Sequence, residues 1–126
     1  MADSWKPLKA WPELIVERLD DAGVARIVLN RPDKRNALNG ALVEAWFAAL
    51  EVIRADRSLK VVITKGAGGV YSSGLDLHFL RSLKGGVERD WDRPSPTIQL
   101  AETLRAFPRI TIALCKAIAS AARSAS

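Results

Sequence analysis

The sequence contains one cysteine, Cys115, and one histidine, His78, among its 126 residues. A single cysteine excludes a disulfide framework and a thiolate metal cage and fits a reducing compartment, so we expect a cytoplasmic location and no bound metal. No apolar run reaches the roughly 18 residues that a membrane span needs, and residues 1–19 mix charges with prolines. We therefore expect neither a membrane anchor nor a signal peptide.

Aromatic residues are also scarce, at 6% of the chain. The net charge is +5 and the pI is near 9.8, which is compatible with a polyanionic partner such as nucleic acid or a phosphorylated cofactor. The tightest basic group is Arg31, Lys34 and Arg35, and no aromatic residue lies among them to stack on a base. We expect no nucleic-acid partner.

The remaining composition, 48% hydrophobic and 26% charged, is typical of one soluble globular domain. Alternation predicts short strands at Leu14–Leu19 and Val24–Leu29. The Asp-rich turn that ends in Gly23 predicts that they form an antiparallel hairpin.

A helix is predicted after this hairpin, with Asn39 as its N-cap. Its apolar residues recur at the spacing of one helical face, and they are Leu42, Trp46, Ala49, Leu50 and Ile53. The β-branched run Lys60–Thr64 predicts a parallel strand buried on both faces, which implies covering layers on both sides of it.

The second half of the chain predicts a loop over Ser82–Pro96, a helix and a strand. The helix begins at Ser95-Pro96 and ends before Pro108, and the strand is Ile110–Ile112. The predicted buried face of this helix is Ile98, Leu100, Ala101, Leu104 and Phe107.

A candidate functional segment, Tyr71–Leu77, follows a glycine-rich loop after the buried strand. Small residues at a strand-to-helix turn leave backbone N–H groups free to bind a carbonyl oxygen or a phosphate, as half of an oxyanion hole does. Such turns are mostly structural, so the residues alone favour the structural interpretation.

Four blocks of sequence, in their order and spacing, resemble the N-terminal half of the crotonase superfamily, the enoyl-CoA hydratase/isomerase family. They are Asn30–Leu38, Val61–Gly66, Ser73–Leu77 and Pro108–Ala113. The resemblance implies an α/β fold, a ClpP/crotonase-like spiral of β-β-α units that is incomplete in this chain. It also implies homotrimers or hexamers that act on acyl-CoA thioesters, in reactions such as those of fatty acid metabolism, with coenzyme A as part of the substrate and no separate cofactor.

The resemblance also implies roles for individual residues. The backbone N–H of Leu75 would be one of two oxyanion-hole donors to the thioester oxygen. Residues implied to bind CoA are Lys34, Arg35 and Ala37, near the adenine and phosphates, and Ser73, Gly74, Leu75, Asp76 and Leu77. A solvated loop is the equal alternative for the basic group. For Asp76 we favour a structural role, as a helix-start cap. The family tolerates many residues at His78, so a catalytic role is disfavoured there.

The chain departs from the family after Ala113. Where the family has a Gly-x-x-x-Gly-Gly helix start, this chain has Ala117, Ala121 and Ala122, and Ala122 stands at the second oxyanion donor. The added methyl groups would obstruct close approach of a thioester. No acidic residue follows Glu102, so the family's acid/base carboxylates are missing as well.

A frameshift explains this departure. For one GC-rich choice of codons, the shifted frame after Ala113 encodes Val-Gln-Gly-Asp-Cys-Leu-Gly-Gly, which restores the glycine pattern. Alanine runs in GC-rich code often yield glycine when shifted, which is the simpler alternative. We therefore divide the chain into an N-terminal extension (1–13), a crotonase-like part (14–113) and an aberrant tail (114–126).

Three functional hypotheses follow. The first is an acyl-CoA enzyme, with hydratase, isomerase, hydrolase and carbon–carbon lyase reactions all open. The second is a non-catalytic fragment that binds CoA or associates with relatives, in which Val61–Ile63 lack strand neighbours and the exposed half-core aggregates. The third and least favoured is a small basic nucleic-acid-binding protein.

Overall fold

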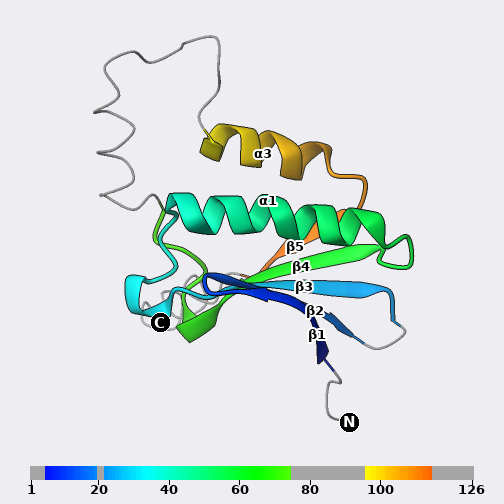
Figure 1. The fold of residues 1–126 in the computed structure, drawn as a ribbon, viewed down its shortest axis with the longest axis horizontal. Coiled ribbons are helices and arrows are strands. Elements are labelled where there is room, and N and C mark those ends of the chain that lie inside the picture. Colours follow the sequence, from blue (N-terminus) through cyan, green and yellow to red (C-terminus); the bar gives the residue numbers. More distant parts are fainter. Residues whose placement is uncertain (1–4, 20–21, 75–95, 115–126) are drawn as a thin grey trace, which may run out of the picture.

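The computed structural model describes residues 5–19, 22–74 and 96–114. These residues form two layers, a five-stranded sheet and a layer of two helices (Figure 1). The strand order in the sheet is β1-β2-β3-β4-β5, which is also the order along the chain. In chain order the elements are β1 (Trp5–Trp11), β2 (Leu14–Leu19), β3 (Val24–Leu29), η1 (Pro32–Lys34), α1 (Gly40–Ala55), β4 (Val61–Gly66), η2 (Ala67–Gly69), α3 (Pro96–Ala106) and β5 (Ile110–Ala113).

The predicted hairpin is confirmed, because β2 and β3 pair antiparallel with Leu19 opposite Val24. Gly23 closes the turn with a φ of +72°, a conformation that disfavours a residue with a Cβ. Its carbonyl oxygen accepts hydrogen bonds from the N–H groups of Lys60 and Val61 at 2.7 and 3.2 Å. The turn thus joins the hairpin to the start of β4.

The helix α1 begins as predicted, since Oδ1 of Asn39 accepts a hydrogen bond from the N–H of Leu42 at 2.9 Å. Its predicted apolar face is confirmed as the face that packs on the sheet. The buried residues of the helix are Leu42, Val43, Ala45, Trp46, Ala49, Leu50 and Ile53. Each fully buried leucine or isoleucine contributes about 1.5–3 kcal/mol, so this contact is the main hydrophobic core.

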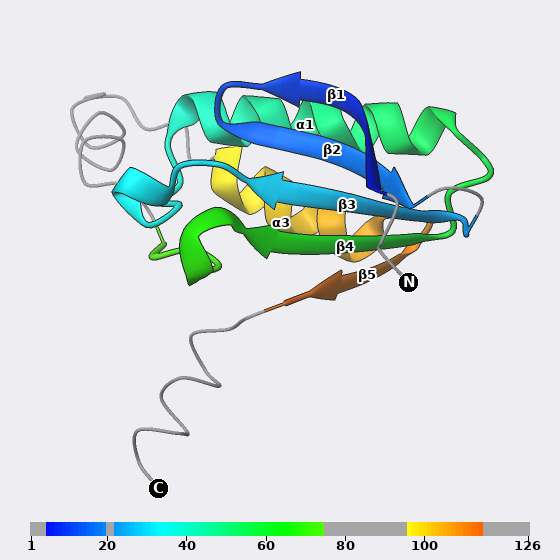
Figure 2. The same cartoon turned by 90° about the horizontal axis from the view of Figure 1, so that it is seen from below.

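The strands β3, β4 and β5 run parallel. Their carboxyl ends therefore lie at one end of the sheet, and the loops that follow β3 and β4 leave from that end (Figure 2). In α/β proteins ligands bind preferentially outside the carboxyl ends of parallel strands. The fold thus places two of the predicted site segments at an end of the sheet where such sites occur.

The prediction that β4 is buried on both faces is wrong for the described residues. Val62 and Thr64 are buried, on the face of the sheet that the helices cover, whereas Val61 and Ile63 point to the other face and are half-buried. Figure 2 looks onto that other face, with both helices behind the sheet. The expectation that β4 lacks strand neighbours is also wrong, since β3 and β5 flank it.

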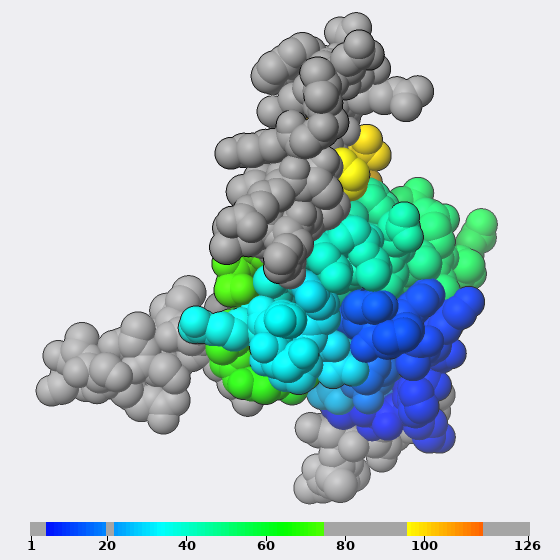
Figure 3. All heavy atoms as spheres, turned by 60° about the vertical axis from the view of Figure 1, so that its left-hand side comes forward, coloured from blue at the N-terminus to red at the C-terminus, as the bar shows by residue number. Residues whose placement is uncertain are grey.

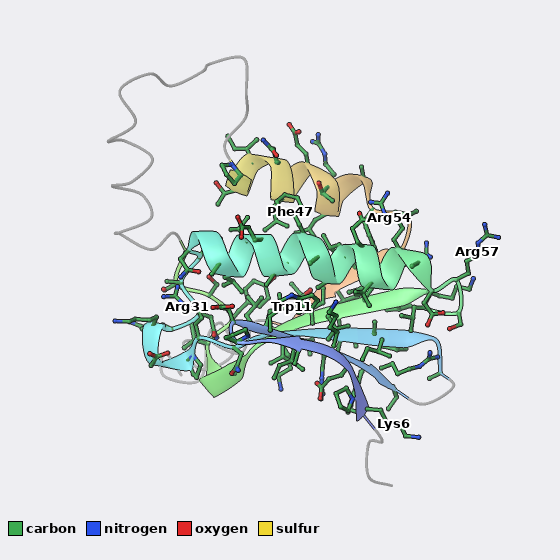
Figure 4. All side chains as sticks on the ribbon, in the orientation of Figure 1. Lys6, Trp11, Arg31, Phe47, Arg54 and Arg57 are labelled. Atoms are coloured by element: carbon green, nitrogen blue, oxygen red, sulfur yellow. The ribbon has the colours of Figure 1, made fainter. Side chains whose placement is uncertain are left out.

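Two further features differ from the sequence patterns. Residues Trp5–Trp11, within the segment assigned to an N-terminal extension, form the strand β1 and pair with β2. The helix α3 has the predicted bounds, but of its predicted buried face Ile98 is 48% exposed and Ala101 is exposed too. This helix packs beside α1, with Phe47 pointing between the two helices (Figure 4), and Leu100 is its one buried residue, so a narrow stripe suffices for its packing.

Within the ranges that the structure describes, no helix is long and apolar enough to cross a membrane.

Candidate functional site

The candidate site is formed by two loops at the carboxyl ends of the parallel strands β3 and β4. One follows β3 and contains Arg31–Leu38, and the other follows β4 and contains Ala67–Gly74. In Figure 3 the first loop, in cyan, lies against the green segment that follows β4. The loop that carries Lys34 and Arg35 therefore lies beside the loop that carries Ser73 and Gly74.

Asn36 holds the two loops together. Its side chain is fully buried, and Nδ2 donates hydrogen bonds to the carbonyl oxygens of Ala67 and Val70 at 2.9 and 2.7 Å. Its Oδ1 accepts a hydrogen bond from the N–H of Arg31 at 2.7 Å. A buried amide whose hydrogen bonds are all formed in this way fixes both loops, because breaking any of them leaves a polar group without a partner and shielded from water.

The backbone also joins the two loops. The N–H of Ser73 donates to the carbonyl oxygen of Arg35 at 3.0 Å, and the N–H of Leu38 donates to that of Gly74 at 2.7 Å. Arg35 and Asn36 reach this geometry with φ of +53° and +55°, the left-handed region that is uncommon for residues other than glycine. Residues held there by surrounding bonds cluster at ligand sites.

The candidate residues differ in what they present to solvent. Lys34, Arg35, Ser73 and Gly74 are exposed, so two cations and a short polar segment face outward. Ala37 is buried at 8% exposure, and its carbonyl oxygen accepts a hydrogen bond from Nη1 of Arg31. Its methyl group therefore belongs to the interior, and a ligand would meet the residues on either side of it.

Several predicted site residues lie outside the described residues. They are Leu75, Asp76, Leu77 and Ala122. His78, for which a catalytic role is disfavoured, also lies outside the described residues. The described chain stops next to Leu75, at Gly74, whose φ is +96° and whose N–H is bound by the Ser72 hydroxyl oxygen at 3.1 Å. The oxyanion-hole assignments thus stay predictions.

A small cavity of about 40 Å³ lies beside the candidate site, between the ends of β4 and β5. Gly66, Tyr71 and Leu114 are among its lining residues. A larger, open groove of about 660 Å³ lies at the opposite end of the sheet, near the amino ends of β4 and β5. Its lining residues include Arg54, Arg57, Lys60 and Arg109. Figure 4 shows Arg31 and Arg57 at these two ends of the molecule. We place the candidate site at the Arg31 end, because it is there that the predicted residues meet.

The groove at the opposite end holds a structural cluster. Arg109 donates from Nε to the carbonyl oxygen of Leu59 and from Nη2 to that of Arg54 at 3.4 Å. It thus connects the start of β5 to the end of α1 and to the loop that follows α1. Hydrogen bonds from Ser58, followed by the charges of Arg18 and Arg109, lower the pKa of Asp56 below its ordinary value of 3.8. These groups are engaged with one another, as in an ordinary loop anchor.

Sequence reasoning missed Asn36 and Gly66 as site residues. A Cβ on Gly66 would lie 1.9 Å from the carbonyl oxygen of Val70 and 2.5 Å from Nδ2 of Asn36, so only glycine fits. The signal for Asn36 was its residue type, since asparagine tolerates the left-handed region better than most residues do. Among the described residues, no group of three histidine, cysteine, aspartate or glutamate side chains could hold a metal.

Comparison with solved structures gives the fold class. An enoyl-CoA hydratase/isomerase from Xanthobacter autotrophicus Py2 is 31% identical and superposes with a TM-score of 0.67, over 85% of this chain and 39% of that chain. The predicted crotonase-like fold is therefore confirmed, in the form of a partial fold.

The sequence comparison gives the family. The enoyl-CoA hydratase/isomerase family matches residues 20–122, and this chain belongs to that family. A hydroxycinnamoyl-CoA hydratase-lyase of Pseudomonas fluorescens is 35% identical over 62% of this chain and 28% of its own length. The mitochondrial enoyl-CoA hydratase domain-containing protein 2 of Bos taurus is 32% identical over 82% of this chain. This chain spans 39% of that bovine relative.

Proposed function

We propose that the chain binds acyl-CoA thioesters at the site formed by the loops after β3 and β4. Family membership supports the class of ligand. The observation that supports the proposal is the junction of the two loops through Asn36, which brings the loop with the exposed Lys34 and Arg35 beside the loop with the exposed Ser73 and Gly74. Two exposed cations beside a polar backbone segment suit the phosphates of coenzyme A.

The chemical part of the proposal concerns the thioester carbonyl. The N–H of Leu75, directly after Gly74, would donate to the thioester oxygen and polarise it toward an enolate. A second donor would come from Ala122, where the methyl groups of the alanines narrow the approach. Because no carboxylate follows Glu102 to move protons, we propose binding with little or no turnover by this chain alone.

Binding is tested by calorimetric titration with coenzyme A and with pantetheine, which lacks its phosphates. We expect Lys34→Ala and Arg35→Ala to weaken coenzyme A binding by about tenfold together, since a charge-assisted hydrogen bond is worth about 1.5–3 kcal/mol before solvent screening. Pantetheine binding should change little. The matched control is Arg57→Ala, which removes an exposed cation in the groove at the opposite end of the sheet. Equal effects of all three variants would contradict this site.

Turnover is tested separately with crotonyl-CoA, by following its enoyl-thioester absorbance. We expect no decay above background for this chain. Steady decay that Gly74→Ala abolishes would instead favour a hydratase. Sedimentation velocity tests the homotrimers or hexamers that the family resemblance implies, and we propose that the present chain forms them only weakly.

A further inference from the structure

Two surface grooves lie away from the candidate site and share one lining residue, Arg54. The first is the open groove of about 660 Å³ near the amino ends of β4 and β5. The second, of about 460 Å³, lies between α1 and α3. Its lining residues are Phe47, Arg54, Gln99, Glu102, Thr103 and Ala106. In Figure 4 Phe47 and Arg54 lie on the side of α1 that faces α3. We call the two grooves together the joined groove.

The first groove carries an excess of positive charge. Within the described part of the chain, four of its six lining residues are cations and none is acidic. These residues are Arg54, Arg57, Lys60, Pro108, Arg109 and Ile110. The neighbouring carboxylate of Asp56 pairs with Arg18 at 3.1 Å. Glu51 lies 3.6 Å from Nε of Arg54, in an exposed pair that neutralises little of the charge. A groove lined by charges of one sign attracts ligands of the opposite sign.

Two of the four cations are held in place by the fold. Arg109 donates to three carbonyl oxygens, those of Leu59, of Pro108 at 2.8 Å and of Arg54 at 3.4 Å. A guanidinium has five N–H groups, so two remain for a ligand. The guanidinium of Arg54 lies 5.4 Å from the ring centroid of Phe107. Cations that are fixed before binding lose less conformational entropy when an anion arrives.

The other two cations, Arg57 and Lys60, have no structural task in the fold. Both are exposed, and within residues 5–19, 22–74 and 96–114 neither side chain forms a hydrogen bond or an ion pair. The C-terminal end of α1 attracts cations, but its dipole is equivalent to only about half a negative charge. That half charge does not account for a cluster of four. These two side chains are therefore available to bind an external anion.

We propose that the joined groove binds an extended acidic peptide segment of another protein. Its carboxylates lie over the cations of the first groove, because guanidinium groups bind carboxylates through paired hydrogen bonds. The following residues run between α1 and α3, past Phe47. Glu102, in that second groove, repels further acidic residues, so the acidic residues are confined to one end of the bound segment. This inference does not rest on the binding of coenzyme A.

A compact phosphate fits the joined groove less well than a peptide does. Phosphate sites commonly use backbone N–H groups at the start of a helix. The first groove meets the end of α1 instead, where Arg109 already binds the carbonyl oxygen of Arg54. Each exposed cation is screened by salt and binds a single anion weakly. A peptide that reaches both grooves combines several weak contacts, which a compact phosphate cannot do.

The probe is a fluorescein-labelled peptide of six glutamates followed by leucine and two glycines, titrated with the full chain by fluorescence anisotropy. We expect 1:1 binding that weakens as salt is added. Arg57→Ala and Lys60→Ala together should weaken it by about tenfold, since each exposed ion pair contributes up to about fivefold. Gln99→Trp, which narrows the second groove, should weaken it by about threefold.

The matched control combines Lys34→Ala with Arg35→Ala, which removes the same charge at the other end of the sheet and should leave peptide binding unchanged. Circular dichroism checks folding, and Arg57→Glu alone carries the test if the double variant is not folded. Equal binding of a glutamine version of the peptide, or equal weakening by the control, overturns the proposal.

Two further results would also overturn it. If tripolyphosphate displaces the probe at lower concentration than the unlabelled peptide does, the groove is a simple anion site. If Gln99→Trp has no effect, the ligand does not extend between the helices. Coenzyme A titration of the same two double variants tests the proposed function separately, because the Lys34 and Arg35 pair should affect only coenzyme A and the Arg57 and Lys60 pair only the peptide.

Discussion

Nδ2 of Asn36 lies 2.7 Å from the carbonyl oxygen of Val70, a residue 34 positions further along the chain. This bond connects the loop after β3 with the loop after β4. Because the amide is fully buried, the connection is protected from competition with water. The surface that we propose for coenzyme A therefore depends on a residue that itself faces the interior.

Replacing Asn36 by alanine should destabilise the protein by about 2–4 kcal/mol, since it leaves three partly buried backbone groups without the partner that joins the loops. Urea unfolding measures the loss. The control is Asn30→Ala, which removes one long hydrogen bond, 3.4 Å, to Pro12. Equal losses for the two variants would show that Asn36 does not hold the loops together.

Gly66→Ala should destabilise the protein by about 3 kcal/mol, because the added Cβ overlaps the carbonyl oxygen of Val70. Gly69→Ala separates this clash from backbone strain. Gly69 has a φ of +87°, and a Cβ added there would meet open space, so that variant should lose only about 1–2 kcal/mol. Thermal unfolding of both variants makes the comparison, and a larger loss for Gly69→Ala would contradict the clash.

Trp46 is buried in the core at 4% exposure, and its indole N–H has no hydrogen-bond partner among the residues that the structure describes. Trp46→Phe removes this unpaired donor and keeps most of the ring, so we expect a change in stability within about 1.5 kcal/mol. Trp46→Ala leaves a cavity and should cost about 3–5 kcal/mol. Chemical denaturation of the pair gives the answer, and similar costs would mean that the N–H has a partner in solution.

Asp56 predicts an acid dependence of stability. Its pKa is lowered by hydrogen bonds from Ser58 and by the charge of Arg18, whose Nη1 lies 3.1 Å from Oδ2. A carboxyl group with a lowered pKa in the folded state stabilises that state above its ordinary pKa, and this contribution is lost as the pH falls through the lowered value. Asp56→Asn should therefore be less stable than the unchanged chain at pH 7.

The difference between the two proteins should shrink as the pH drops below the ordinary value of 3.8 and vanish below the lowered pKa. Denaturant midpoints across this range measure it. Glu44→Gln, which removes an exposed charge of α1, is the control and should not reproduce this dependence. A constant difference down to the lowest pH would contradict the assignment.

Local patterns predicted most of the secondary structure. The spacing of Leu42, Trp46 and Ile53 indicated the sheet-facing side of α1, and Asn39 marked its start, because helix periodicity and capping depend on neighbouring residues. The same patterns failed for Ile98. Ile98 does lie on the apolar stripe of the helix. How much of that stripe is buried depends on the elements that pack against the helix, which the local pattern does not specify.

Sequence by itself determined the hairpin, the helices, the parallel strand β4 and the family, since each depends on residue order and short-range spacing. Tertiary structure alone decided that Asn36 joins the two candidate loops and that, within the described ranges, β5 is the last strand of the sheet and has exposed apolar side chains. Both depend on contacts between segments about 30 to 50 positions apart. The same tertiary contacts decide which face of a strand is covered, because alternation marks two faces without saying what packs on each.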